Sequence, residues 1–488
     1  MGYDDEVSRY RAWVVQPNIQ HFDEMEGFLH PEYPLYPSDQ SYTSTILALS
    51  RSREPAGAKR AHQLLNRMLK LYDSGEWFKN RPSLLAFNSV ITAYANSQEV
   101  GSADRAESVL NHLEKLYFDA DKPQYNYLKP DVITYNAAVA AWSKSREEAA
   151  VYRAEDIVRR MEAHHGSFGD NFLDVKPDLY TYNSLIFSWL RSNLGVESAE
   201  KAEAILKQLI EKYNNGEEEY LPSQKTFCSV INAWGKCGSE RVSVKKAVDL
   251  LRLMEGMNEE GVKSLKPDVI TYTSVIDAIA RSRMPEGSEM SLDMLHKMER
   301  MYAAGDDSMK PNVKSYSCVL QSLIHSNIPD RHIKAREILE GMEEIGVEPN
   351  AFTYNYVINC CTRIQGDDQT KMEGFKVALN AFTSLRKSSH ETDCFTYAFF
   401  LKACALLPET STKSQIVRNT FYECRKEGKV NNEVIKRLIG CSQNNQDFLR
   451  ELLLSTRRID NIRFITVHDL PSEWSRNSRG NFKRKGRR

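Results

Sequence analysis

The sequence predicts an all-α protein, an α-solenoid of helix-turn-helix repeats, and three observations carry this prediction. A phrase that reads KPDVITYN at 129–136 recurs along the chain at nearly regular intervals. Apolar residues at helical spacing follow each recurrence. The composition, with 41% hydrophobic and 27% charged residues in a chain of 488, is that of a folded protein and excludes collagen-like or disordered chains.

The recurring phrase divides most of the chain into nine units. Two close copies read KPDLYTYN at 176–183 and KPDVITYT at 266–273, and weaker copies fill the gaps. Each unit is 38 to 48 residues long, counted from the residue after the Asp, Asn or Ser of the phrase. A unit of this kind buries its apolar face only by stacking on its neighbours. The predicted units are 39–83, 84–131, 132–178, 179–223, 224–268, 269–312, 313–350, 351–393 and 394–432.

Each unit is predicted to be a pair of helices. Its fourth, seventh, eighth and eleventh positions are mostly apolar, as at Tyr135, Val139 and Trp142, which places one apolar stripe on a first helix. A second amphipathic run follows, as at 202–211 and 247–256. Because the residue before proline avoids the α region, the Lys-Pro-Asp phrase should end the second helix. Its last residue should then cap the next first helix.

The two ends of the chain are assigned from their composition. Residues 1–38 contain four prolines and are expected to form a partly ordered lead-in. Residues 433–475, with an apolar run at 447–455, are expected to form helices that cap the exposed end of the solenoid. The last thirteen residues, 476–488, hold seven Arg or Lys and no acid. They should be a disordered basic tail, which adds affinity for nucleic acid, is merely solvated, or serves as a nuclear-type address.

Charge and cysteine content narrow the function further. Lys plus Arg number 65 against 66 Asp plus Glu, so binding to a polyanion would need a local stripe of positive charge. The nine cysteines contain no CxxC pair and are expected to be reduced and mostly buried. No stretch has the length and hydrophobicity of a membrane span, and no transit peptide is visible at the start.

The phrase Pro-Asp-x-x-Thr-Tyr-Asn and the helix pairs resemble the pentatricopeptide repeat family, in its plain type without editing extensions. The resemblance covers 39–432. The units are about ten residues longer than the family's usual unit, like the long repeats of algal and stramenopile organelle proteins. They also resemble the repeat region of protein-only ribonuclease P. Tetratricopeptide repeats, which grip peptides, are the alternative, but their W-x₂-L-G-x₂-Y motif is absent.

The resemblance implies a right-handed superhelix that binds single-stranded RNA at roughly one nucleotide per repeat, read by the fifth and last residues of each unit. Short polar side chains at the fifth position can reach the Watson–Crick edge of a splayed base. The last residue also suits an N-terminal cap, and the sequence leaves both roles open. The predicted base-reading residues are Thr43, Asn88, Asp131, Asn136, Asp178, Asn183, Ser223, Thr273, Asn312, Ser317, Asn350, Asn355 and Asp393.

The family's pairing of these residues predicts which base each unit prefers. The expected order is N-U-U-C-N-A-A-U-N from 5′ to 3′, since the family binds RNA parallel to its chain. The preferences of the units at 39–83, 224–268 and 394–432 stay open.

Two more positions on the first helix complete the predicted site. The second position supplies stacking platforms for bases, or else packs between hairpins. The thirteenth position supplies cations for the phosphate backbone, or else solvated charges at helix ends. The predicted stacking residues are Leu85, Ile133, Tyr180, Ile270, Phe352 and Phe395. The predicted phosphate contacts are Arg51, Lys144, Arg191, Lys236, Arg281 and Arg363.

No motif in the sequence supports catalysis. The HxE at 30–32 lacks the CxxC of a zinc deaminase, and 433–488 is too short for an appended nuclease domain. We therefore expect no enzyme activity, no cofactor, no metal site and no small-molecule substrate.

The expected function is sequence-selective binding of single-stranded RNA in organellar RNA stability, processing or translation, with RNA-processing proteins as partners and no membrane. A protein-binding scaffold and the RNA-specificity subunit of a nuclease complex are the alternatives. The resemblance favours mitochondrion or plastid. With an acidic start at Asp4, Asp5 and Glu6, such a location implies either a true start further upstream or unconventional targeting.

Overall fold

The computed structural model describes residues 39–52, 54–74, 81–97, 99–166, 175–237, 240–442, 445–453 and 465–478. Within these ranges the secondary structure consists of α-helices and short 3₁₀ turns without a strand, which confirms the predicted all-α helical-repeat solenoid. The lead-in expected at 1–38 and residues 479–488 of the tail expected at 476–488 lie outside the described residues. The first three residues of that expected disordered tail are ordered instead, and the backbone N–H of Asn477 donates to the carbonyl of Gly428 at 2.8 Å. The chain divides into two compact halves, Met1–Ala233 and Trp234–Arg488.

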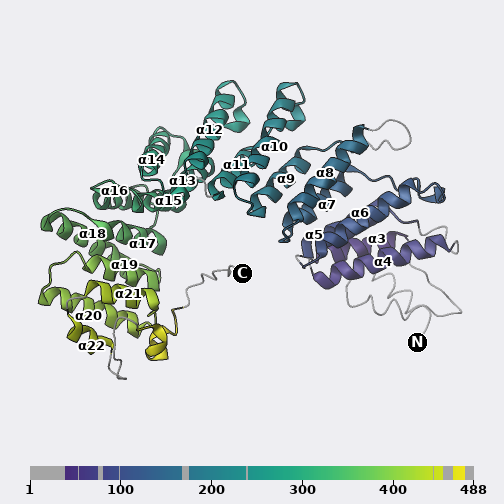
Figure 1. Ribbon diagram of the computed structural model, residues 1–488. Helices are drawn as coiled ribbons and strands as arrows, with labels where there is room; N and C mark the ends of the chain where they lie inside the picture. The colour runs from purple at the N-terminus through teal and green to yellow at the C-terminus, as the bar shows by residue number, and fades with distance from the viewer. Residues whose placement is uncertain are drawn as a thin grey trace. The chain divides into compact units, whose positions relative to one another are not determined.

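The N-terminal half is a series of helical hairpins, each with a first and a second helix (Figure 1). Its helices are α3 (Asp39–Arg51) and α4 (Pro55–Asp73), α5 (Leu84–Ser97) and α6 (Ser102–Phe118), α7 (Val132–Lys144) and α8 (Ala150–Gly166), and α9 (Leu179–Ser192) and α10 (Val196–Asn214). The next helix, α11 (Gln224–Lys236), contains the boundary between the two halves.

The C-terminal half continues the same alternation from α12 (Glu240–Glu259) onward. Its hairpins are α13 (Val269–Ser282) and α14 (Gly287–Ala303), α15 (Val313–Ile324) and α16 (Arg331–Glu344), α17 (Ala351–Cys360) and α18 (Asp368–Lys387), α19 (Cys394–Cys404) and α20 (Ser411–Lys426), and α21 (Asn432–Cys441) and α22 (Gln446–Leu453). None of the described helices combines the length and the apolar character needed to cross a membrane.

The hairpins stack through their first helices. In the N-terminal half α3, α5, α7 and α9 contact one another in this order, and in the C-terminal half α13, α15, α17, α19 and α21 do the same. Each of these first helices other than α21 also packs against the second helix of its own hairpin. Within each half, the first helices therefore form one layer and the second helices another.

The Pro-Asp phrase starts the first helices for a local reason. Asp178 lies in extended conformation before α9, and its side chain accepts a hydrogen bond from the backbone N–H of Thr181. The Thr181 hydroxyl accepts from the N–H of Asp178, which completes a capping box. A complete capping box also precedes the first helices at Asp131, Asn312 and Asp393, and the side chains of Asp268 and Asn350 accept the corresponding backbone hydrogen bond.

A buried tyrosine at the fourth position ties each of several first helices to the second helix before it. The Tyr135 hydroxyl donates to Glu114 at 2.6 Å, and the Tyr316 hydroxyl donates to Glu299 at 2.9 Å. Tyr182 and Tyr272 bond in the same way to Glu162 and Glu255. Burial and the neighbouring carboxylate together raise the pKa of these phenols, so they remain hydrogen-bond donors at neutral pH.

Part of the extra length of the units is folded into short turns. Short 3₁₀ turns lie between second and first helices: η2 (Pro123–Tyr125), η3 (Glu218–Tyr220), η4 (Lys263–Leu265) and η5 (Asp307–Met309). The last residue of each turn is buried, with at most 1% of its surface exposed. These side chains anchor the long connection before the chain enters the next Pro-Asp phrase.

The C-terminal end continues the stack. Asn431 caps α21 by accepting a hydrogen bond from the N–H of Val434, so α21 begins at Asn432, one residue before the predicted boundary. The 3₁₀ turn η9 (Ser472–Ser475) then returns to α20, where Trp474 packs edge-on against Phe421 at 5.9 Å between ring centroids. The described part of 433–475 is thus two helices plus a folded return segment, which also contains η8 (Val467–Asp469).

Candidate functional site

The first helices present four positions along one side: the second, fifth, ninth and thirteenth residues of each predicted unit. We call the surface that these residues form the reading face. In each half it is built by the layer of first helices, and their capped N-termini bring the last residue of one unit beside the fifth residue of the same unit.

The structure brings the predicted base-reading residues together in pairs. Asn136 donates from Nδ2 to both carboxylate oxygens of Asp178 at 3.2 Å, and Asn355 donates to Asp393 Oδ1 at 3.2 Å. Asn88 donates from Nδ2 to Asp131 Oδ1 at 3.4 Å. In the first unit the hydroxyls of Thr43 and Ser83 lie 3.2 Å apart.

In three other units the fifth residue contacts the residue three positions after the last one. Asn183 Oδ1 accepts a hydrogen bond from Thr226 Oγ1 at 2.8 Å, and Thr226 is held by the capping residue Ser223. The hydroxyl of Thr273 lies 2.7 Å from that of Ser315, which is capped by Asn312. Ser317 lies 3.2 Å from Thr353, which is capped by Asn350.

Capping and pairing use the same oxygen atom, Oδ1, in all three carboxylates that pair with an asparagine, and only Asp178 also accepts from its asparagine through Oδ2. Asp131 Oδ1 accepts from the backbone and hydroxyl of Thr134 and also from Asn88. Asp393 Oδ1 does the same for Thr396 and Asn355. Both roles left open by the sequence, the cap and the place beside the fifth residue, are therefore present in one side chain, and in Asp131 and Asp393 the second oxygen takes no part in these bonds.

Two buried amide oxygens in these pairs have no hydrogen-bond partner among the described residues. They are Asn88 Oδ1 and Asn355 Oδ1, on side chains only 9% and 5% exposed. An unsatisfied buried acceptor costs about 1–3 kcal/mol. Asn136 Oδ1, at the corresponding position, accepts from Thr181 Oγ1 at 2.6 Å instead.

The apolar residues at the second position lie in solvent. Their exposed fractions range from 37% at Phe395 to 65% at Ile133. Large apolar side chains of this kind are normally buried in a protein core. This exposure argues against packing between hairpins, the alternative that the sequence left open. The residues are Leu85, Ile133, Tyr180, Ile270, Phe352 and Phe395.

The cations at the thirteenth position are all exposed. Lys144 donates to the side chain of Asn96, which holds the thirteenth position of the preceding unit, at 2.9 Å. The Arg191 guanidinium lies 5.5 Å from the ring centroid of Phe187. The set consists of Arg51, Lys144, Arg191, Lys236, Arg281 and Arg363.

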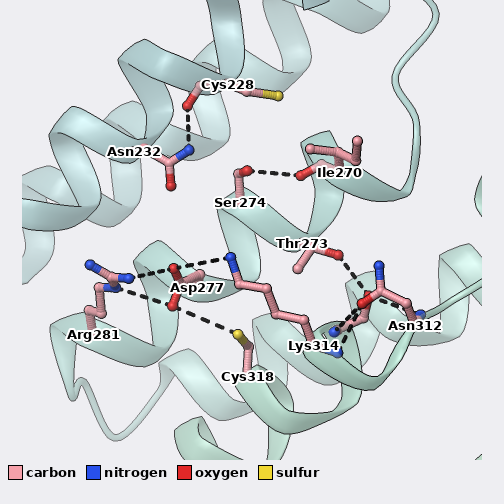
Figure 2. A network of polar contacts seen from close by, with 11 residues as sticks. Cys228, Asn232, Ile270, Thr273, Ser274, Asp277, Arg281, Asn312, Lys314 and Cys318 are labelled. Carbon is pink, nitrogen blue, oxygen red and sulfur yellow. Dashed lines mark hydrogen bonds and ion pairs between the residues drawn. The ribbon is translucent and has the colours of Figure 1, made fainter. Parts of the chain in front are cut away.

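Arg281 forms an ion pair with a carboxylate of its own helix. Asp277, four residues before it on α13, accepts from its guanidinium at 2.8 and 3.1 Å. The Lys314 ammonium lies 3.8 Å from the same carboxylate, as Figure 2 shows. Lys314 stands at the second position of its unit, where other units have an apolar platform. Burial and Asp277 also raise the pKa of the Cys318 thiol, which points at this carboxylate, to about 12.

Sequence reasoning missed the ninth position. Its residues are uncharged in most units, but the sixth unit has Asp277 and the ninth has Lys402. The spacing of four between the fifth, ninth and thirteenth positions is the signal that could have found them, because such residues follow one another along a helix. Among the described residues no group of three or more His, Cys, Asp or Glu side chains is placed to hold a metal ion.

The comparison with protein families identifies the repeat. Residues 303–363 match the pentatricopeptide repeat domain, a range that contains α15 and α16 with the flanking η5 and α17. Within this range the chain is similar to the pentatricopeptide repeat domain. No curated protein matches the sequence of this chain.

Solved structures similar to this chain include the pentatricopeptide repeat protein PPR10 in complex with an 18-nucleotide psaJ RNA element, and a triple cysteine-to-serine variant of PPR10 with the same RNA element. Each is 19% identical with a TM-score of 0.37, and the match covers 91% of the present chain. The match spans 58% of the length of those chains.

Proposed function

We propose that this protein binds single-stranded RNA sequence-selectively, at about one nucleotide per repeat, and acts in organellar RNA stability, processing or translation by occupying its transcript. The observation that carries the proposal is the recurrence, in the second, third and eighth units, of an exposed apolar side chain at the second position together with a hydrogen-bonded pair of fifth and last residues. Such a side chain offers a stacking surface, and the pair beside it offers donors and acceptors to a base edge.

The polar pairs carry the base selectivity in this proposal. Uracil presents an N3–H donor between two carbonyl oxygens. At Asn88 and Asn355 the buried amide oxygen without a partner would accept such an N–H, which removes the cost of leaving it unsatisfied. These two units are among those whose residues predict uracil, and the pairs in the remaining units set the rest of the expected order N-U-U-C-N-A-A-U-N.

The exposed platforms and cations supply the affinity that does not depend on sequence. Stacking on an aromatic platform contributes about 1–3 kcal/mol per base. Tyr180, Phe352 and Phe395 are the aromatic platforms, and the aliphatic platforms Leu85, Ile133 and Ile270 stack less strongly. The cations at the thirteenth position would follow the phosphate backbone, so binding should weaken as salt concentration rises.

A salt titration tests the proposal directly. Purified protein is mixed with a fluorescent pool of random single-stranded RNA, and the dissociation constant is measured at increasing salt. We expect the logarithm of the affinity to fall linearly with the logarithm of the salt concentration, and selection from the pool to enrich the predicted order of bases. A protein-binding scaffold would show no salt-dependent RNA binding and no enriched sequence, and that result would reject RNA binding.

A further inference from the structure

Three cations meet at the C-terminal end of the reading face. Arg363 closes η6 (Cys361–Arg363), Lys402 is the ninth residue of its unit on α19, and Arg437 lies on α21. The helix α19 packs against η6 and against α21, so the three residues lie on contiguous elements. Only Arg363 belongs to the thirteenth-position cations. Lys402 and Arg437 add to it from positions that are uncharged in most units.

These charges are incompletely compensated. Burial and the charges of Arg363, Arg437 and Arg331 lower the pKa of Lys402 to about 8, against the opposing effect of one carboxylate, Glu433. Arg331 bonds to the backbone carbonyls of Cys360 and Ser326 and to no carboxylate among the described residues.

Arg437 brings a hydrogen-bond donor without an acceptor to the cluster. Its Nη2 lies 2.5 Å from Glu433, and its buried Nε has no hydrogen-bond partner among the described residues. The cluster therefore carries a net positive charge together with a hydrogen-bond donor that lacks an acceptor. Both features suit an anion with several acceptor oxygens.

The corresponding place in the sixth unit is arranged in the opposite way. There the ninth residue is Asp277, which neutralises Arg281 and draws in Lys314. Lys402 stands at the equivalent position of the ninth unit and adds positive charge where Asp277 removes it. On the reading face, the cations around the ninth position of the sixth unit are therefore balanced by a carboxylate. Those around the ninth position of the ninth unit repel each other.

We propose that Arg363, Lys402 and Arg437 form a binding site for RNA phosphates 3′ of the nucleotide that the ninth unit reads, so that the RNA continues over α21. This inference rests on the proposed function and on the parallel orientation of the RNA. A phosphodiester accepts hydrogen bonds through two oxygens and carries one negative charge. It would supply both the acceptor that Arg437 lacks and the counter-charge that the cluster lacks.

The first test compares salt dependences on a random 20-nucleotide RNA pool. Variants of the full chain carry Lys402→Met with Arg437→Met, or the matched changes Arg252→Met with Lys376→Met on the second helices α12 and α18. We expect the slope of log affinity against log salt to fall by roughly 1.4 in the first variant, for two lost phosphate contacts on single-stranded RNA, and to stay unchanged in the second. Equal slopes in the two variants would overturn the site.

The second test locates the site along the RNA. The probes are the nine-nucleotide RNA 5′-AUUCAAAUA-3′ with a 3′ hydroxyl, the same RNA with three added uridines at its 3′ end or at its 5′ end, and the same RNA with a 3′ phosphate. We expect the 3′ addition to tighten binding about tenfold and the 5′ addition about twofold or less, with the difference lost in Lys402→Met with Arg437→Met. Equal gains from both additions would reject the placement.

The remaining outcomes separate the source of the phosphate and the two proposals. If the 3′-phosphorylated nine-mer alone gains tenfold, the site holds a terminal phosphate rather than a continuing backbone. Should the paired cation variant fail to fold, Glu433→Gln offers an opposite test, because removing the one carboxylate should tighten pool binding about twofold. No binding of the pool by the unaltered protein would reject the proposed function itself, whereas binding without these differences rejects only the site.

Discussion

The carboxylate of Asp178 accepts hydrogen bonds both from a helix N-terminus and from the fifth residue of its unit. It caps α9 through Thr181 and accepts both bonds from the amide of Asn136. Removing the carboxylate therefore mixes a loss of helix stability, about 1 kcal/mol for a lost cap, with any change in RNA recognition. The fifth residue is the cleaner position for a test because it caps no helix.

Exchange of Asn136 for Thr should change the base that the third unit prefers. Threonine offers one hydroxyl in place of an amide, and in the resembling family Thr followed by Asp prefers guanine, so we expect uracil to give way to guanine. Selection from a random RNA pool, followed by sequencing, measures this. Asp178→Ser is the matched change on the partner, since serine still caps a helix.

The two variants give distinct expected outcomes. Asp178→Ser creates the pair found naturally at Asn183 and Ser223, for which the family's pairing favours cytosine. We expect the free energy of unfolding of both variants, measured by thermal unfolding with circular dichroism, to stay within about 1 kcal/mol of that of the unaltered protein. If the selected base at this position remains uracil in both variants, these residues do not read RNA in the predicted register.

The lowered pKa of Lys402 predicts that the stability of the folded protein depends on pH. Its pKa in the folded protein, about 8, lies below its ordinary value because burial and Arg363, Arg437 and Arg331 disfavour the charged form more than Glu433 favours it. Between pH 8 and about 10.5 the unfolded chain therefore binds this proton better than the folded chain does, and the contribution of Lys402 to stability becomes less unfavourable as pH rises. Below pH 8 the full cost is present.

Replacement of Lys402 by Met should accordingly raise the melting temperature at pH 7 by roughly 2 °C. The advantage should shrink at pH 10, where the native lysine is neutral. Thermal unfolding at the two pH values measures the difference, with the exposed Lys376→Met on α18 as a control that should shift neither value. A gain that is the same at both pH values would show that packing, and not charge, limits stability at this position.

At the scale of the helix, two tryptophans at equivalent positions differ in their hydrogen bonds. Trp142 on α7 donates from Nε1 to Glu107 at 2.8 Å. Trp189 on α9 is equally buried, but its Nε1 has no partner among the described residues and the side chain borders a cavity of about 250 Å³. The residue that corresponds to Glu107, Glu155, pairs with Lys201 at 3.2 Å instead.

Trp142→Phe should therefore destabilise the protein by about 1–2 kcal/mol more than Trp189→Phe. Both changes remove the same aromatic volume from a buried stripe, but only the first removes a bond to a buried carboxylate. Urea unfolding followed by circular dichroism measures the two free energies. Equal losses would mean that the bond to Glu107 contributes no net stability.

At the scale of the helix, the elements that could be predicted are those set by residues close together in the sequence. The first helices begin where the Pro-Asp phrase predicts because proline, cap and threonine act within four residues. The 3₁₀ turns were not predicted, since they depend on burying Tyr125, Tyr220, Leu265 and Met309 against distant helices. In three of these four turns the buried residue lies two positions before the proline of the phrase, as Tyr220, Leu265 and Met309 do, and this spacing was the available signal.

The candidate site divides in the same way. The pairing of fifth and last residues follows from the repeat itself, so the sequence alone could place them together. The pairing of Arg281 with Asp277 could have been predicted from their spacing of four residues, whereas the approach of Lys314 and the crowding of Lys402 could not, because these depend on contacts between different helices. Asp277 and Arg281 are four residues apart on α13, but Lys314 comes from α15.

For the whole molecule, net charge and binding surface have to be considered separately. The chain has a net charge of −1, yet its thirteenth positions contribute exposed cations in both halves. Cations that follow a backbone one per repeat act through contact and counterion release, which do not require a positive protein. Salt dependence therefore reports the reading face, whereas net charge does not.

Replacing Lys144, Arg191 and Lys236 by Gln should weaken binding of every RNA to a similar degree and reduce the salt slope by roughly 2. Adding Arg281→Gln should change the slope by less than the roughly 0.7 of a free contact, because Asp277 already neutralises Arg281. Asp277→Asn with Arg281 intact should have the opposite effect and steepen the slope, since it releases Arg281 and Lys314. A slope that falls by the same amount for each of the four cations would show that RNA displaces Asp277 from Arg281 on binding.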